Sequence, residues 1–303
     1  MLTAFTANLL VALMKVTLAI FSGSTVLFAE AAHSISDTVN QLFLLQGIRL
    51  SRQPPSQRYP FGRGKEQFLW SFIAAVSVFG ISSLLSIWEG IQKLILPSYP
   101  RHLESSLVFL VAIGIIELYA LRITYTNIVK RASRRKVSGL RHFFSIERDP
   151  IILATFLEDI VAVAGILVAA ASIYLSYALK LVIFDSAGSI VIGLMLLAYG
   201  AVLATQSKSL LVGEGLPQDY IDRIKTLVQA MPEVIKVLDV RGVYFGSNSI
   251  VLGLDVYFIP GLDTVRLQSA IDKIEKTLKS EIKEIAYIYV EAENPQVEPP
   301  ESE

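Results

Sequence analysis

The sequence predicts an α-helical membrane protein with six transmembrane helices, followed by a small α+β domain. The 303 residues are 53% hydrophobic and only 18% charged, whereas soluble domains carry about 25% charged residues. Charge also divides the chain, because residues 1–213 hold 18 Lys/Arg and 11 Asp/Glu while residues 214–303 hold 9 and 16. An apolar, basic part is thus followed by a polar, acidic part, which predicts a domain boundary near residue 213.

Six apolar stretches come close to the roughly 20 residues that a membrane-spanning helix needs. The connections after the second and fourth stretches are rich in Lys and Arg, and the opposite connections are poor in them. Because basic loops stay in the cytoplasm, we expect a multi-pass protein of the cell membrane with both termini cytoplasmic. We assign residues 1–208 to this transmembrane domain. The six stretches are 3–22, 25–48, 67–90, 104–127, 151–173 and 183–206.

Residues 214–291 are expected to form a cytoplasmic, ferredoxin-like α+β domain with the order helix, strand, strand, helix, strand. Apolar residues recur at helical spacing after Pro217, and proline suits the first turn of a helix. Asp263 is a suitable N-cap for the second helix. The tail 292–303 is rich in Pro and Glu, a composition typical of disorder. Strands are predicted at 237–245, 250–258 and 285–290, and the apolar residues of 250–258 alternate so that they fall on one face.

The second apolar stretch carries a stripe of polar residues that predicts a metal site. Glu30, His33, Asp37, Asn40 and Gln41 follow each other at spacings of three and four, so they share one helix face. Ionisable groups at membrane depth usually face a bundle interior or a water-filled path. An imidazole and a carboxylate four residues apart can bind one cation. The alternative is that His33 and Asp37 only hydrogen-bond to each other or to a neighbouring helix. Glu30 and Gln41, nearer the helix ends, are expected to face water.

The fifth stretch supplies the other candidate ligands. Thr155 and Asp159 are four residues apart and share a face, and Glu158 lies about 100° round the helix from Asp159. We expect Asp159 to be a metal ligand. Glu158 is a second ligand, a proton carrier or the partner of a basic residue. The predicted metal site is therefore His33, Asp37 and Asp159, with Glu158 and Thr155 as further candidates.

Three other charges, Lys15, Glu89 and Glu117, interrupt apolar stretches. Glu89 lies close to the end of its stretch and is expected to be solvated. Lys15 is expected either to extend toward the interface or to neutralise an acid. Glu117 is open between a transport role and an ion pair, for which Arg122 is the nearest candidate in sequence. The chain has no cysteine, which excludes disulfides and thiolate metal sites.

Two motifs resemble those of the cation diffusion facilitator family. Residues 29–37, with His33 and Asp37, resemble its second-span motif HxxxD, and residues 59–66 resemble its YPFGxGKxE entry to the third span. Residues 148–165 look like the branch that contains an animal mitochondrial zinc transporter, which has an acidic pair here. The family places His or Asp at a position that Thr155 occupies in this chain.

The resemblance implies a transporter, not an enzyme, that exports a divalent cation in exchange for protons, usually as a homodimer. The expected partners are the lipid bilayer, the cation and protons, with no nucleic acid and no cofactor besides the transported ion. Zn²⁺ is the expected cargo, while one imidazole with carboxylates also suits Fe²⁺, Co²⁺ or Mn²⁺. The alternative is a non-transporting membrane metal sensor or scaffold. All three histidines precede residue 214, so the C-terminal domain is expected to lack a histidine-based metal site.

Overall fold

A computed structural model describes residues 2–97, 103–134, 139, 143–144, 150–247 and 249–294. The chain divides into two compact units. The first contains residues 1–50 and 66–208, and the second contains residues 51–65 and 209–303. The chain leaves the first unit after residue 208, and the connection Ser51–Lys65 between α2 and α3 also belongs to the second unit.

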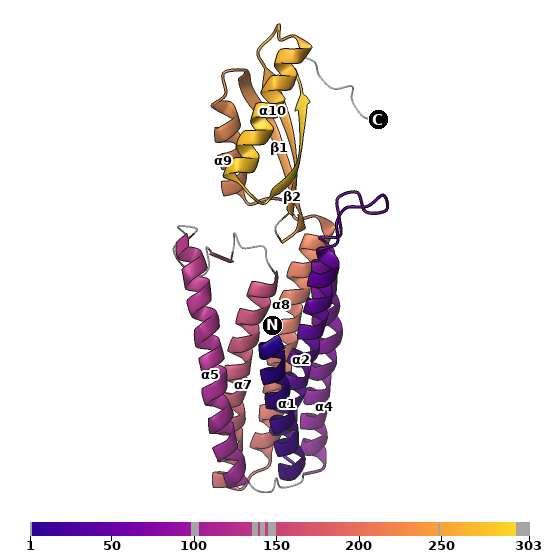
Figure 1. The fold of residues 1–303 in the computed structure, drawn as a ribbon. Helices are drawn as coiled ribbons and strands as arrows, with labels where there is room; N and C mark the ends of the chain where they lie inside the picture. The colour runs from indigo at the N-terminus through magenta and orange to yellow at the C-terminus, as the bar shows by residue number, and fades with distance from the viewer. Residues whose placement is uncertain are drawn as a thin grey trace. The chain divides into compact units, whose positions relative to one another are not determined.

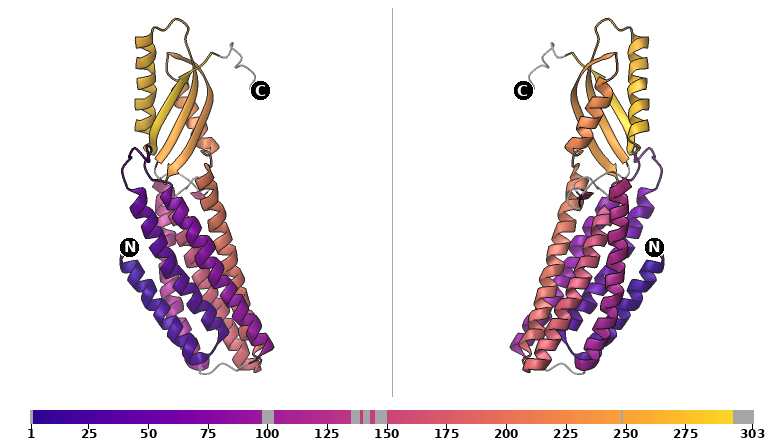
Figure 2. Two further views of the ribbon diagram at one scale, coloured as in Figure 1. Left: turned by 90° about the vertical axis from the view of Figure 1, so that its right-hand side faces the viewer. Right: turned by 90° about the vertical axis from the view of Figure 1, so that its left-hand side faces the viewer.

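The first unit is a bundle of long helices that run side by side, as Figures 1 and 2 show. Each of the six predicted apolar stretches lies in a helix, and most of these helices extend beyond the predicted bounds. The third is continuous but contains one π-helical segment, an irregularity with i to i+5 hydrogen bonds. The helices are α1 (Leu2–Ser22), α2 (Thr25–Ser51), α3–η1–α4 (Glu66–Ile73, Ala74–Phe79, Gly80–Ile95), α5 (Leu103–Arg134), α7 (Pro150–Leu179) and α8 (Ile183–Val212).

Four of these helical stretches in the described residues are long and apolar enough to cross a membrane. Among the described residues of α1, the stretch Asn8–Ser22 is an apolar helix shorter than 18 residues. Helix α2 is long, but its polar stripe lowers its mean hydropathy. The count of six spans therefore stays a prediction for α1 and α2. The four stretches are Glu66–Ile95, Ser106–Ser133, Ile152–Leu179 and Ile183–Val212.

Small and aromatic side chains pack the bundle. Buried serines line the contact of α4 with α8, where Ser189 donates to the Ser86 carbonyl at 2.7 Å. Small residues allow helices to approach closely in membranes. The Phe79 and Tyr199 rings meet edge to face at 4.5 Å, and the Tyr199 hydroxyl donates to the Ala154 carbonyl of α7 at 3.1 Å. These contacts fix α7, which carries two candidate acids, against α8.

The second unit contains a small α+β domain with the predicted element order. Strand β1 pairs antiparallel with β2, and β2 pairs parallel with β3. Side chains of β2 alternate between buried and partly exposed, so one face of the sheet covers the core with α9 and α10. Asp263 accepts a hydrogen bond from the Arg266 backbone, which confirms the predicted cap. The predicted tail lies almost wholly outside the described residues. The elements are α9 (Gln218–Gln229), β1 (Val234–Gly246), β2 (Ser249–Phe258), α10 (Thr264–Glu281) and β3 (Ile285–Ala292).

Candidate metal-binding cavity

Three of the predicted site residues line one small cavity in the helix bundle. Asp37 of α2 and the pair Glu158 and Asp159 of α7 surround a space of about 40 Å³, together with Glu117 of α5. The remaining lining comes from the small or short side chains Asn8, Val11, Ser34, Ala120 and Ala162. The cavity is thus enclosed by α1, α2, α5 and α7, and four carboxylates belong to its wall.

Part of this acidity has no partner. Asp37 Oδ1 and Asp159 Oδ2 are buried without a hydrogen-bond partner among the residues that the structure describes. Glu158 is different, because Asn40 of α2 donates to its Oε2 at 3.2 Å. Buried polar groups normally have a partner, and an exception calls for an explanation such as a missing ion or water.

His33 directly precedes the cavity residue Ser34 in the sequence, but it does not line the cavity itself. Its Nδ1 is 3.4 Å from Asp37 Oδ2, and neither ring nitrogen has a hydrogen-bond partner in the described part of the chain. The imidazole is fully buried. His33 and Asp37 are therefore close to each other, whereas the ionisable residues that line the cavity are all acids.

The predicted ligands do not converge fully. No group of three His, Asp or Glu side chains within the described ranges is close enough to hold a metal ion. Thr155, four residues before Asp159 on α7, is partly buried and makes an interaction of its own, but it does not line the cavity. In this conformation the acids are gathered around one space without closing on it.

The prediction that Glu30 faces water is wrong. Glu30 is fully buried, and its Oε2 accepts from Lys15 Nζ of α1 at 2.9 Å. Glu117 pairs with the same lysine at 3.5 Å, whereas Arg122 is exposed. Lys15 therefore neutralises acids, which is one of the two alternatives predicted for it from the sequence. The sequence signal for this pairing was the charge of Lys15 within an apolar stretch.

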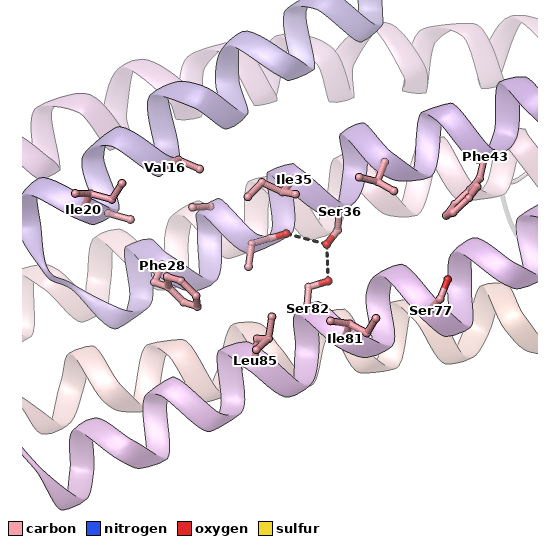
Figure 3. A pocket seen from close by; sticks show the side chains of 14 residues that line it. Val16, Ile20, Phe28, Ile35, Ser36, Phe43, Ser77, Ile81, Ser82 and Leu85 are labelled. Atoms are coloured by element: carbon pink, nitrogen blue, oxygen red, sulfur yellow. Dashed lines mark hydrogen bonds between the residues drawn. The ribbon is translucent and has the colours of Figure 1, made fainter.

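A larger cavity in the same unit has a different character. It measures about 620 Å³ and lies between α1, α2 and α4. Figure 3 shows its mostly apolar lining, with Ser36 hydrogen-bonded to Ser82 across it. No carboxylate or imidazole belongs to its lining. A divalent cation therefore has suitable ligands only in the smaller of these two cavities.

A family model supports the membrane character of the first unit. The model described as the cation efflux transmembrane domain matches residues 1–212. Three relatives with names that concern metals are also similar. Metal tolerance protein C4 of Arabidopsis thaliana is 30% identical over 82% of this chain and 54% of its own length. The human protein named proton-coupled zinc antiporter SLC30A9, mitochondrial, is 29% identical over 79% of this chain and 42% of its own length.

The third relative covers less of the chain. Zinc transporter ZitB of Escherichia coli is 32% identical over 34% of this chain and 31% of its own length. The chain thus spans about half the length, or less, of these curated relatives. Among solved structures, a variant of the MamM C-terminal domain in its nickel form matches 25% of this chain and 96% of that chain, with 19% identity and a TM-score of 0.24. A likeness this weak supports no structural argument.

Proposed function

This chain belongs to the cation diffusion facilitator family of cation efflux transporters, and on that premise we propose that it exchanges a divalent metal cation for protons across a membrane. The observation that carries the proposal is the acid-lined cavity, with buried carboxylate oxygens of Asp37 and Asp159 that lack partners among the described residues. Ionised carboxylates at membrane depth are costly, so a cation that compensates them is the simplest reason for their place.

Zn²⁺ is the proposed cargo. His33 lies 3.4 Å from Asp37, and a nitrogen ligand beside carboxylates favours Zn²⁺ and similar ions over Mg²⁺ or Ca²⁺. A modest change of the His33 and Asp37 side chains would bring nitrogen and oxygen to one ion. The names of the human and Escherichia coli relatives, which concern zinc, support the same choice.

Proton exchange follows from the chemistry of the ligands. Carboxylates bind metal when ionised and imidazole when neutral, so protons compete with the metal for the same atoms. A membrane side with few available protons would load the cation, and the opposite side would release it. Glu158, which is hydrogen-bonded to Asn40, is either a further ligand or the proton carrier. Thr155 remains a weaker candidate ligand.

We further propose the cell membrane as the location, a homodimer as the assembly, and a cytoplasmic position for both termini. The orientation rests on the basic connections after α2 and α5. One relative is named mitochondrial, so location and orientation need a direct test.

The test is Zn²⁺ transport by the full chain in proteoliposomes with an imposed pH gradient. We expect Asp37→Ala and Asp159→Ala to abolish transport. Each variant removes a carboxylate and so leaves part of the cation's charge uncompensated in a low-dielectric site. Thr155→Ala should retain appreciable activity, since a neutral hydroxyl is a weak ligand that water replaces. Asp272→Ala, an exposed acid of α10, is the matched control.

Glu158→Gln separates the two roles of that residue. A weaker Zn²⁺ affinity would identify a ligand, while unchanged affinity with a flat pH dependence would identify the proton carrier. Full proton-coupled transport by the Asp37→Ala protein would refute the site. Zn²⁺ binding without any transport by the unaltered protein would favour the membrane metal sensor instead.

A further inference from the structure

A buried lysine connects the wall of the acid cavity to a second acid outside it. Lys15 of α1 is 2% exposed, and its Nζ lies 2.9 Å from Glu30 of α2 and 3.5 Å from Glu117 of α5. Glu117 lines the cavity, whereas Glu30 does not. A lysine ammonium has three donors and no acceptor, so it can hold both carboxylates at once. One cation thus ties three helices together beside the proposed metal site.

The outer acid is itself fixed. A Cβ at Gly165 of α7 would overlap Glu30 Oε1, so the Glu30 carboxylate occupies a space on α7 that only glycine leaves open. Glu30 is fully buried. Because its carboxylate is confined on one side by α7 and bonded on the other to Lys15, the ammonium has a defined position. The ammonium in turn sets where the Glu117 carboxylate lies.

The inner acid is placed to meet a cation. Glu117 shares the cavity wall with Asp37, Glu158 and Asp159. Asp37, which also lines this space, is 7% exposed, and its Oδ1 is buried without a hydrogen-bond partner among the described residues. The four acids are the charged residues that line the cavity, and His33 Nδ1 lies 3.4 Å from Asp37 Oδ2 behind this wall.

We propose that Glu117 is a further acid of the metal-binding cavity, and that Lys15, anchored by Glu30, is the positioning residue that holds it in the wall. This inference rests on the proposed function, because it adds a residue to the same site. Lys15 does not touch the cation. Its contribution is to hold the Glu117 carboxylate, 3.5 Å from Lys15 Nζ, in place in the cavity wall.

The test measures Zn²⁺ binding by isothermal titration calorimetry with the full chain in lipid nanodiscs at fixed pH. Glu117→Gln keeps the shape and removes the charge, and we expect it to weaken Zn²⁺ binding by about tenfold to a hundredfold, the range found when groups supporting a metal site are removed. Lys15→Met should weaken binding as well. Glu89→Gln changes a partly buried glutamate of α4 that lies outside the cavity and should bind Zn²⁺ like the unaltered protein.

The double variant distinguishes positioning from general destabilisation. If Lys15 acts through Glu117, then Lys15→Met combined with Glu117→Gln should bind Zn²⁺ no more weakly than Glu117→Gln alone, because coupled residues are not additive. Multiplied losses would show that Lys15 acts independently and would overturn its assignment. If Lys15→Met does not fold, Lys15→Met with Glu30→Gln removes both charges of the buried pair and should give a folded protein with the same loss.

The two proposals fail in different ways. Unchanged Zn²⁺ affinity of Glu117→Gln, together with loss of binding in Asp37→Ala, would overturn this inference and leave the proposed function standing. Unchanged affinity in both variants would place the Zn²⁺ site elsewhere and refute the proposed function as well. A lower melting temperature of Glu117→Gln with unchanged affinity would assign it a structural role only and overturn the inference.

Discussion

Asp185 is the residue whose removal should destabilise the helix bundle most clearly. It lies in the first turn of α8 and is fully buried. Its carboxylate accepts from the Ser24 hydroxyl, from the Thr25 backbone and hydroxyl at 2.9 Å each, and from Lys93 Nζ at 2.9 Å. Lys93 also donates to the Gly23 carbonyl at 2.7 Å. One buried ion pair thus joins the turn between α1 and α2 to the end of α4 and the start of α8.

The expected magnitude follows from this geometry. Two unit charges 2.9 Å apart attract by about 6 kcal/mol at an effective dielectric constant of about 20, and desolvation of both groups offsets much of that gain. Asp185→Ala leaves Lys93 buried and unpaired, a change that costs about 3–5 kcal/mol in buried pairs. Because Lys93 retains the Gly23 carbonyl, we expect a loss near the lower end, about 3 kcal/mol.

Equilibrium unfolding in mixed micelles of a mild detergent and sodium dodecyl sulfate, followed by circular dichroism, measures this free energy. Asp185→Asn combined with Lys93→Met removes both charges and keeps an acceptor for the Thr25 backbone, so it should cost less than Asp185→Ala by about 2 kcal/mol, since an ion pair lost as a unit leaves no unpaired charge. Asp272→Ala serves as the exposed control. A loss below about 1 kcal/mol for Asp185→Ala would mean that the pair is solvated, and the reasoning would be refuted.

Three further outcomes are expected. Cysteines introduced singly at Ser56 and Ser133 should resist an impermeant thiol reagent applied outside intact cells, and labelling of either would contradict the proposed orientation. A fragment of residues 214–291, which contains no histidine, should bind Zn²⁺ only weakly in a titration, and submicromolar affinity would show that its carboxylates form a site. Gly64→Val should increase proteolysis of its loop, because a Cβ there would overlap the Phe245 carbonyl oxygen; unchanged proteolysis would mean that the loop can shift at little cost.

The sequence predicted the helices of the first unit well because apolar runs of this length have few other structures available to them. It also indicated a buried face of α2, since His33, Asp37 and Asn40 recur at helical spacing and all are buried, although Glu30 of the same stripe was expected to face water and is buried as well. The same spacing places residues on a face but does not identify the helix opposite. The stripe therefore indicated a site on α2 but did not identify the residues of other helices that line it.

The long-range ion pairs lay beyond sequence reasoning for this reason. Lys15 and Glu117 are 102 residues apart, and Lys93 and Asp185 are 92 residues apart. Each charge was visible in or beside an apolar stretch, and burial without a partner would be costly. That cost predicts that a partner exists, but only the packing of α1 against α5, and of α4 near α8, identifies it.

The segment 59–66, which resembles the family's entry to the third span, makes contacts with the second unit of the folded chain. Phe61 packs against Phe245 and Tyr287, with ring centroids 5.6 and 5.1 Å apart, and Lys65 donates to the Leu211 carbonyl at 3.1 Å. These contacts lie within the second unit, so the motif packs against the sheet domain. The same segment follows directly from α2, whose polar stripe contributes to the cavity. The chain passes between the units three times, after residues 50, 65 and 208. Because Phe61 and Lys65 make their contacts within the second unit, substitutions at these residues should change the stability of that unit and not the affinity for the metal.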